Sequence, residues 1–235
     1  MVQKGRAARG RAAAVATLVA VPLLAVFLAI GNEPLSTFVF DGDSMQQIAR
    51  DAIRHADALN VGVMSPGDGA REKVILDHVV QSLQARYGEH ILPEPRWIFN
   101  NAGGAMGAML VLHCSLSEYV ILFGTALGTE GHTGRFLADD YFTILYGEQW
   151  AFPAGSLTKE IYRPGDQHWL PRYTSKQYKM PDSCWALEYA RGNILSMIPF
   201  GLLDTFTSTA DVVPLAQTIY VSAYGMVREM IRGKF

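Results

Sequence analysis

The sequence predicts a mainly β body with helices on either side of it and one membrane-spanning helix ahead of it. An uncharged run of 19 residues at 12–30 is the first sign. From 96 to 190, short β-branched and aromatic runs alternate with Gly, Pro, Asn and Asp about every ten residues, as in all-β domains. Helical periodicity flanks this region on both sides. A chain of 235 residues can bury one large core.

Composition excludes several functions. With 49% hydrophobic and 18% charged residues the chain is not disordered, and a net charge of −2 without a basic stripe argues against a nucleic-acid partner. Cys114 and Cys184 lie in apolar contexts without CxxC spacing, so we expect buried side chains, with one bridge between them left open. The histidines form no HxH pair, and we expect no metal.

Residues 1–31 are predicted to be a cytosolic N-terminus and a transmembrane anchor. At 1.5 Å per residue, the run at 12–30 spans about 28 Å, close to the thickness of a bilayer core. The positive-inside rule places the body in the lumen, because basic side chains precede the run and acidic ones follow it: Lys4, Arg6, Arg9 and Arg11, then Glu33 and Asp41. A cleaved signal peptide is the alternative, but 31–34 is a poor cleavage site.

Residues 32–95 form a helical lead-in. One helix is predicted over 43–57, with Asp43 or Ser44 as its cap, and a second begins near Pro66 and ends at Gly88. Each has one apolar face, and we expect both faces to pack in the core.

Residues 96–191 carry the β body, predicted as a barrel or a sandwich. Two apolar runs, at 102–113 and 119–127, are too short to cross a bilayer and are taken as core strands. The best strand candidates are Met106–His113, Glu118–Phe123, Tyr141–Tyr146, Tyr173–Met180 and Cys184–Tyr189.

Residues 192–235 are predicted to form a pair of apolar helices, at 194–206 and 212–231, with a break at 207–211. The second ends in Arg228, Arg232 and Lys234. These helices can lie in the membrane interface with their basic end near the headgroups, or they can cover an open end of the β body. Both placements are compatible, because each uses a different face of the helices.

The stretch 122–147 concentrates candidate chemistry. It holds His132 and three acids, Glu130, Asp139 and Asp140, but Arg135 is the only basic residue within it. An acid in apolar surroundings acquires a raised pKa, which favours proton chemistry or cation binding. The alternative is a surface hairpin at 124–134 with the aspartates solvated at its edge.

Three segments carry a resemblance to a known family. WIFNNAGGAMGAMLVLHCSLSEYVILFGTALGTEGHTGRF (97–136), FLADDYFTILYG (136–147) and ALEYARGNILSMIPFGLLDTFTST (186–209) resemble the fungal C-8 sterol isomerases and the related sigma non-opioid receptor. The similarity extends over residues 38–235. It implies one N-terminal membrane helix, a cupin-like β-barrel body, two C-terminal helices against the membrane, a homotrimer in the endoplasmic reticulum and no cofactor.

The resemblance implies an isomerase that moves a sterol ring double bond from Δ8 to Δ7. One proton is delivered and another is removed, with a carbocation between the two steps, so acids without basic neighbours suit the reaction. Its partners would be the sterol and the bilayer, with lipophilic amines as inhibitors. The alternative is a non-catalytic membrane protein of receptor type that binds amphiphilic amines.

Glu188 is the first catalytic candidate, because it lies in an apolar strand and matches the glutamate that binds the ligand's cation in the receptor. The alternative is a buried acid paired with Arg191. Asp139 and Asp140 are both candidates for the second carboxyl. Strand alternation sends them to opposite faces, so at most one should point inward.

Two further residues are expected to bind or orient the substrate. Tyr119 matches a tyrosine that orients the glutamate in the family, and core packing is its alternative. His132, in the Gly-rich turn, could shuttle protons, with a structural hydrogen bond as the more favoured use.

Overall fold

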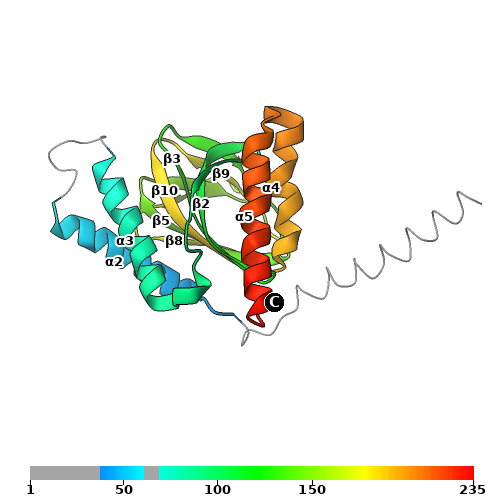
Figure 1. The fold of residues 1–235 in the computed structure, drawn as a ribbon. Helices are drawn as coiled ribbons and strands as arrows, with labels where there is room; N and C mark the ends of the chain where they lie inside the picture. Colours follow the sequence, from blue (N-terminus) through cyan, green and yellow to red (C-terminus); the bar gives the residue numbers. More distant parts are fainter. Residues whose placement is uncertain (1–37, 61–68) are drawn as a thin grey trace, which may run out of the picture.

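The computed structural model describes residues 38–60 and 69–235, which form two lead-in helices, two β-sheets and a C-terminal pair of helices (Figure 1). The anchor predicted at 12–30 and the start of the second lead-in helix near Pro66 lie outside the described residues. Within the described ranges, every helix is too short or too polar to traverse a bilayer.

The lead-in helices are α2 (Gly42–Ala58) and α3 (Ala70–Tyr87). The cap of α2 is Asp41, whose carboxylate accepts a hydrogen bond from the Ser44 amide at 2.8 Å, so the cap predicted at Asp43 or Ser44 is wrong by two or three residues. α3 ends at Gly88 as predicted, where φ is 47° and the short helix η2 (Gly88–His90) begins. The apolar faces of both helices are buried in one core, as expected.

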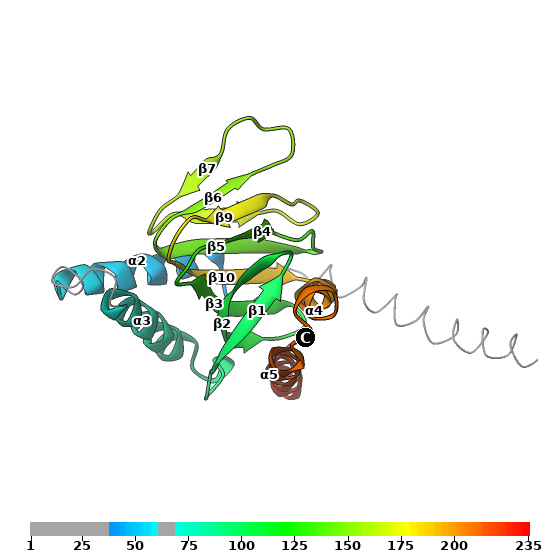
Figure 2. The ribbon, with the colours of Figure 1, turned by 90° about the horizontal axis from the view of Figure 1, so that it is seen from above.

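All strand pairs are antiparallel, and they form two sheets. The six-stranded sheet has the order β1-β2-β3-β10-β5-β8, and the four-stranded sheet the order β4-β9-β6-β7. Figure 2 shows them as layers, with α2 and α3 on one side and α4 and α5 on the other. The bounds are β1 Trp97–Ala102, β2 Ala105–Cys114, β3 Glu118–Thr125, β4 Thr129–His132, β5 Ala138–Tyr146, β6 Gln149–Phe152, β7 Glu160–Tyr162, β8 Gln167–Leu170, β9 Gln177–Met180 and β10 Cys184–Gly192.

Four of the five predicted strands lie within observed strands. The strand predicted at Tyr173–Met180 starts too early, because Tyr173 has φ 65° in a turn and β9 begins at Gln177. Strands β1, β4, β6, β7 and β8 were not predicted. The described chain is β-rich with helices, as expected, but its strands pair into two separate sheets and not into one closed barrel.

The C-terminal region consists of η3 (Ile194–Met197), α4 (Ile198–Asp204), the π-helical turn η4 (Thr205–Thr209) and α5 (Val212–Ile231). The break falls at Ala210, with φ 53°, and α5 has the predicted bounds. α4 packs on β1, and α5 packs on β1 and β2. The expected helical cover over the β body is therefore present.

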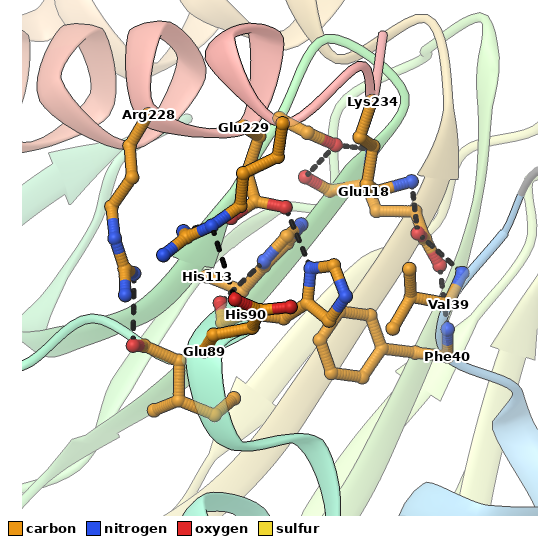
Figure 3. A network of polar contacts seen from close by, with 12 residues as sticks. Val39, Phe40, Glu89, His90, His113, Glu118, Arg228, Glu229 and Lys234 are labelled. Carbon is orange, nitrogen blue, oxygen red and sulfur yellow. Dashed lines mark hydrogen bonds and ion pairs between the residues drawn. The ribbon is translucent and has the colours of Figure 1, made fainter.

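The end of α5 is fixed to the body through a buried glutamate (Figure 3). Glu118 accepts hydrogen bonds from the amides of Val39 (2.8 Å) and Phe40 (3.0 Å) and from the Tyr189 hydroxyl (2.7 Å). The Lys234 ammonium lies 2.6 Å from the same carboxylate. We call these five residues the Glu118 cluster. It joins the chain before α2, the start of β3, the strand β10 and the C-terminus.

Neighbouring contacts hold the last turns of α5. The Glu229 carboxylate lies 2.7 Å from His90 Nδ1, and Arg228 donates to the Ile91 carbonyl at 2.9 Å (Figure 3). Arg232 bonds to Glu229 at 3.2 Å. Arg228, Arg232 and Lys234 therefore all have partners within the protein.

Candidate active site

A cavity of about 180 Å³ lies between the sheets and the C-terminal helices. Its lining is mostly apolar, and the described residues that form it include no lysine or arginine. The six-stranded sheet and the helices both contribute bulky side chains, among them Met109, Phe123, Phe142, Met197, Phe200 and Met226. Such a lining suits a large apolar ligand and keeps the charges within it poorly solvated.

Glu188 lies in the middle of this lining, on β10. Its neighbours Leu187 and Tyr189 point into the core beneath the lead-in helices, so alternation turns Glu188 toward the cavity. Burial raises the pKa of Glu188 to about 7. The alternative partner Arg191 instead donates to the Tyr141 hydroxyl at 2.7 Å. Within the described chain, no cation forms an ion pair with Glu188.

Asp140 is the second carboxyl in the cavity. It lies on β5, where it is paired with Ala190, and Glu188 is paired with the nearby Phe142. Oδ1 of Asp140 is buried and makes no hydrogen bond within the described residues. Burial, and secondly the neighbouring Glu188 carboxyl, hold the pKa of Asp140 well above its usual value.

Asp139 points to the opposite face, as alternation requires. Its carboxylate accepts hydrogen bonds from the Arg172 amide and guanidinium, both at 3.0 Å. Glu130 is also paired, with Lys179 at 2.9 Å. The expectation that these acids lack basic partners is wrong for Glu130 and Asp139, because the partners come from a distant part of the sequence. Of these three acids, only Asp140 has no basic partner among the described residues.

Tyr119 lines the cavity from β3, but it does not orient Glu188 through a hydrogen bond in this structure. Its hydroxyl donates to the Met109 sulfur at 3.9 Å. Burial, with smaller contributions from Cys114 and Glu188, raises the pKa of Tyr119 well above its usual value. The phenol is therefore neutral, and in this structure its one hydrogen is donated to Met109.

His132 lies at the exposed rim of the cavity, near the Phe200 ring. Its Nδ1 accepts a hydrogen bond from the Gly134 amide at 2.9 Å, so the structural hydrogen bond considered from the sequence is present. This contact holds the Gly-rich turn in place. His132 therefore has a structural hydrogen bond and is not part of the acid pair formed by Glu188 and Asp140.

Two further polar residues line the cavity, Gln149 and His168, and no pattern in the sequence marks them as site residues. Both are almost fully buried, at 2% and 3% exposure. Burial lowers the pKa of His168 to about 4, with a smaller contribution from Lys176, so the ring is neutral. Each sits on a short strand that was not predicted, and only the assembled fold brings it to the cavity.

Cys114 and Cys184 are both buried free thiols, which settles the pairing left open by the sequence. Among the described residues, no group of three or more His, Cys, Asp or Glu side chains is arranged to hold a metal ion.

A β-rich body enclosing an apolar cavity with two adjacent acids defines a protein that binds an apolar ligand and can stabilise positive charge on it. The model of the family described as "ERG2 and Sigma1 receptor like protein" matches residues 15–234, and the chain belongs to this family.

Two relatives illustrate the family. The chain is 45% identical to the C-8 sterol isomerase of Pyricularia oryzae over 224 residues, 94% of this chain and 95% of that protein. It is 41% identical to the sigma non-opioid intracellular receptor 1 of Gallus gallus over 170 residues, 68% of this chain and 76% of the receptor. Among solved structures, a cupin superfamily protein from Desulfitobacterium hafniense matches with a TM-score of 0.32 and 20% identity, over 35% of this chain and 74% of that one.

Proposed function

We propose that this chain is a C-8 sterol isomerase that moves the ring double bond of a sterol from position 8 to position 7. The similarity to isomerases covers nearly the whole chain. The observation that carries the chemistry is the pair Glu188 and Asp140, two carboxyls in one apolar cavity to whose lining no lysine or arginine of the described ranges contributes.

In the proposed mechanism, the protonated member of the pair delivers its proton to C9, which leaves a cation at C8. The ionised member then removes a proton from C7, and the electrons of that C–H bond form the new double bond between C7 and C8. Two carboxyls close together in a dry site readily share one proton, because ionising both is unfavourable. The raised pKa values of Asp140 and Glu188 support this division.

The ionised carboxylate also stabilises the cation. At about 4 Å and an effective dielectric near 20, the interaction contributes about 4 kcal/mol, or roughly a thousandfold in rate. Lipophilic tertiary amines should inhibit as mimics of this cation. Tyr119 is proposed to donate to the carboxyl pair once substrate displaces its contact with Met109, and His132 to shape the entrance.

We also propose that the protein is anchored by residues 12–30 in the endoplasmic reticulum membrane, with a lumenal body, and that it forms a homotrimer. The outer faces of α4, η4 and α5 would lie in the interface of the bilayer. Large apolar side chains on these faces support this placement, since Phe206 is 73%, Tyr220 74% and Ile231 82% exposed.

The alternative function is non-catalytic binding of amphiphilic amines, which the receptor relative and the same acidic cavity favour. Expressing the chain in cells that accumulate Δ8 sterols separates the two. Growth with Δ7 product supports the isomerase, and the Glu188→Gln variant serves as the inactive control. Amine binding by the purified protein without any Δ7 product would reject the isomerase and favour the alternative.

A further inference from the structure

The cavity contains a second polar region, formed by Gln149 of β6 and His168 of β8. Gln149 Oε1 and His168 Nε2 are buried and make no hydrogen bond within the described residues. Buried polar atoms in native proteins almost always have partners, so two unpartnered ones in the lining of a single cavity point to a polar group on the ligand.

Tyr162 of β7 brings the two side chains together. The His168 ring stacks on the Tyr162 ring, with centroids 4.6 Å apart and an interplanar angle of 23°. Gln149 is the β-sheet partner of Tyr162. Tyr162 is itself held by Glu160, to which it donates at 2.8 Å, and Glu160 is paired with Lys176 at 2.6 Å. This wall is therefore fixed by its own contacts, while Gln149 Oε1 and His168 Nε2 have no hydrogen-bond partner among the described residues.

The hydrogen-bonding capacity of the pair fits a hydroxyl group. The His168 imidazole is neutral, so one ring nitrogen donates and the other accepts. The Gln149 amide supplies both a donor and an acceptor. A hydroxyl gives one hydrogen bond and receives others, which matches this combination, and neither side chain offers a charge to an ionic group.

The register places this region at a fixed distance from the carboxyl pair. Phe142 of β5 is paired with Glu188 on one side and with His168 on the other. Cross-strand partners share a face, and two strand spacings put the Cα atoms of 188 and 168 about 10 Å apart. Apolar surface, including Phe142, lies between the two polar ends of the cavity.

A sterol has the same arrangement, with a hydroxyl on ring A and the reacting double bond farther along the fused apolar rings. We propose that Gln149 and His168 bind the ring-A hydroxyl of the sterol and so position its C7–C9 atoms beside Glu188 and Asp140. This proposal rests on the isomerase function proposed above.

The proposal fixes the direction of the bound sterol. β8 is the edge strand opposite to β1 in the six-stranded sheet, and α4 and α5 pack on β1 and β2. With its hydroxyl at β8, the sterol directs its alkyl side chain toward the C-terminal helices, where Phe200 and Met226 line the cavity.

Binding of two unreactive steroids tests the proposal without requiring turnover. The purified full-length protein in detergent micelles is titrated with 5α-cholestan-3β-ol and with 5α-cholestane, which lacks the hydroxyl; neither has a double bond to move. We expect the wild type to bind the alcohol at least about tenfold more tightly, as loss of one satisfied hydrogen bond to a buried group implies. Gln149→Leu and His168→Phe should each reduce this ratio severalfold and leave cholestane binding unchanged.

Asn100→Leu is the matched control, because Asn100 lines the cavity from β1, at the opposite edge of the sheet. It should preserve the ratio, and His168→Asn, which keeps a polar side chain, should restore part of it. A wild type without preference for the alcohol, variants that retain the preference, or loss of it in Asn100→Leu would each overturn the proposal. A preserved preference without conversion of Δ8 sterols would instead reject the isomerase function alone.

Discussion

Two buried glutamates on neighbouring, hydrogen-bonded strands differ in every contact that their carboxyl groups make. Glu118, at the start of β3, has two backbone amides, the Tyr189 hydroxyl and the Lys234 ammonium around it. Glu188, on β10, faces an apolar cavity, and its ionisable neighbours among the described residues are Asp140, Tyr119 and Tyr178, none of which is a cation. A fully partnered buried acid holds segments together, whereas one without partners is available for chemistry.

The strongest test of this contrast removes the charge of Glu188. Glu188→Gln should lower the conversion of Δ8 to Δ7 sterol by roughly a thousandfold or more, because the cation loses about 4 kcal/mol of stabilisation. The midpoint temperature of thermal unfolding should be unchanged or slightly higher, because a poorly solvated acid is replaced by a neutral group of the same size. An active Glu188→Gln enzyme would reject its role.

The two adjacent aspartates provide an internal comparison. Asp140→Asn should lower turnover by at least about a hundredfold, as expected when a general acid or base is lost. Asp139→Asn is the matched control, because Asp139 bonds to Arg172 outside the cavity. It should keep its turnover and lose about 1 kcal/mol of stability or less. Equal losses of activity in the two variants would show that the cavity-facing position is not what matters.

Substitution of Glu118 should have the opposite effect to substitution of Glu188, lowering stability and leaving turnover nearly unchanged. Glu118→Gln removes the carboxylate charge that lies 2.6 Å from the buried Lys234 ammonium, and we expect a loss of about 3 kcal/mol in the free energy of unfolding, measured with denaturant. Turnover of the folded fraction should change little. A Glu118→Gln protein of normal stability would contradict the structural role of the Glu118 cluster.

The smallest expected effect is on the pH dependence of stability. The pKa of Glu188 is raised to about 7 from 4.5, so between these values the folded state binds more protons than the unfolded state. This contribution is complete below about pH 4.5 and is lost as pH rises toward 7. The free energy of unfolding should be roughly 2 kcal/mol lower at pH 7.5 than at pH 5, and this difference should shrink in Glu188→Gln. An unchanged slope in that variant would argue against the raised pKa.

The sequence predicted the regular elements better than the site. α2, β2 and α5 have long, unbroken periodicity, whereas β4, β6, β7 and β8 have only three or four residues each and too few side chains to show alternation. Strand alternation predicts that Asp139 and Asp140 face opposite ways, but which one points inward depends on the pairing of β5 with β10.

The partners of the buried acids also could not be predicted from the sequence. The partners of Glu118 come from positions 39, 40, 189 and 234, and Arg172 reaches Asp139 from 33 residues away. Gln149 and His168 lie on different sheets, and Tyr162 is the strand partner of the first and stacks on the ring of the second. Local spacing carries no information on contacts that tertiary folding creates.

Conversion of a Δ8 sterol in deuterated water tests the central claim most directly, namely that the unpaired carboxyls Glu188 and Asp140 move the protons. The purified wild type should form Δ7 sterol with one solvent deuterium at C9, detected by mass spectrometry and NMR, and Glu188→Gln and Asp140→Asn should form almost none. Labelled Δ7 product at the wild-type rate from either variant would contradict the account.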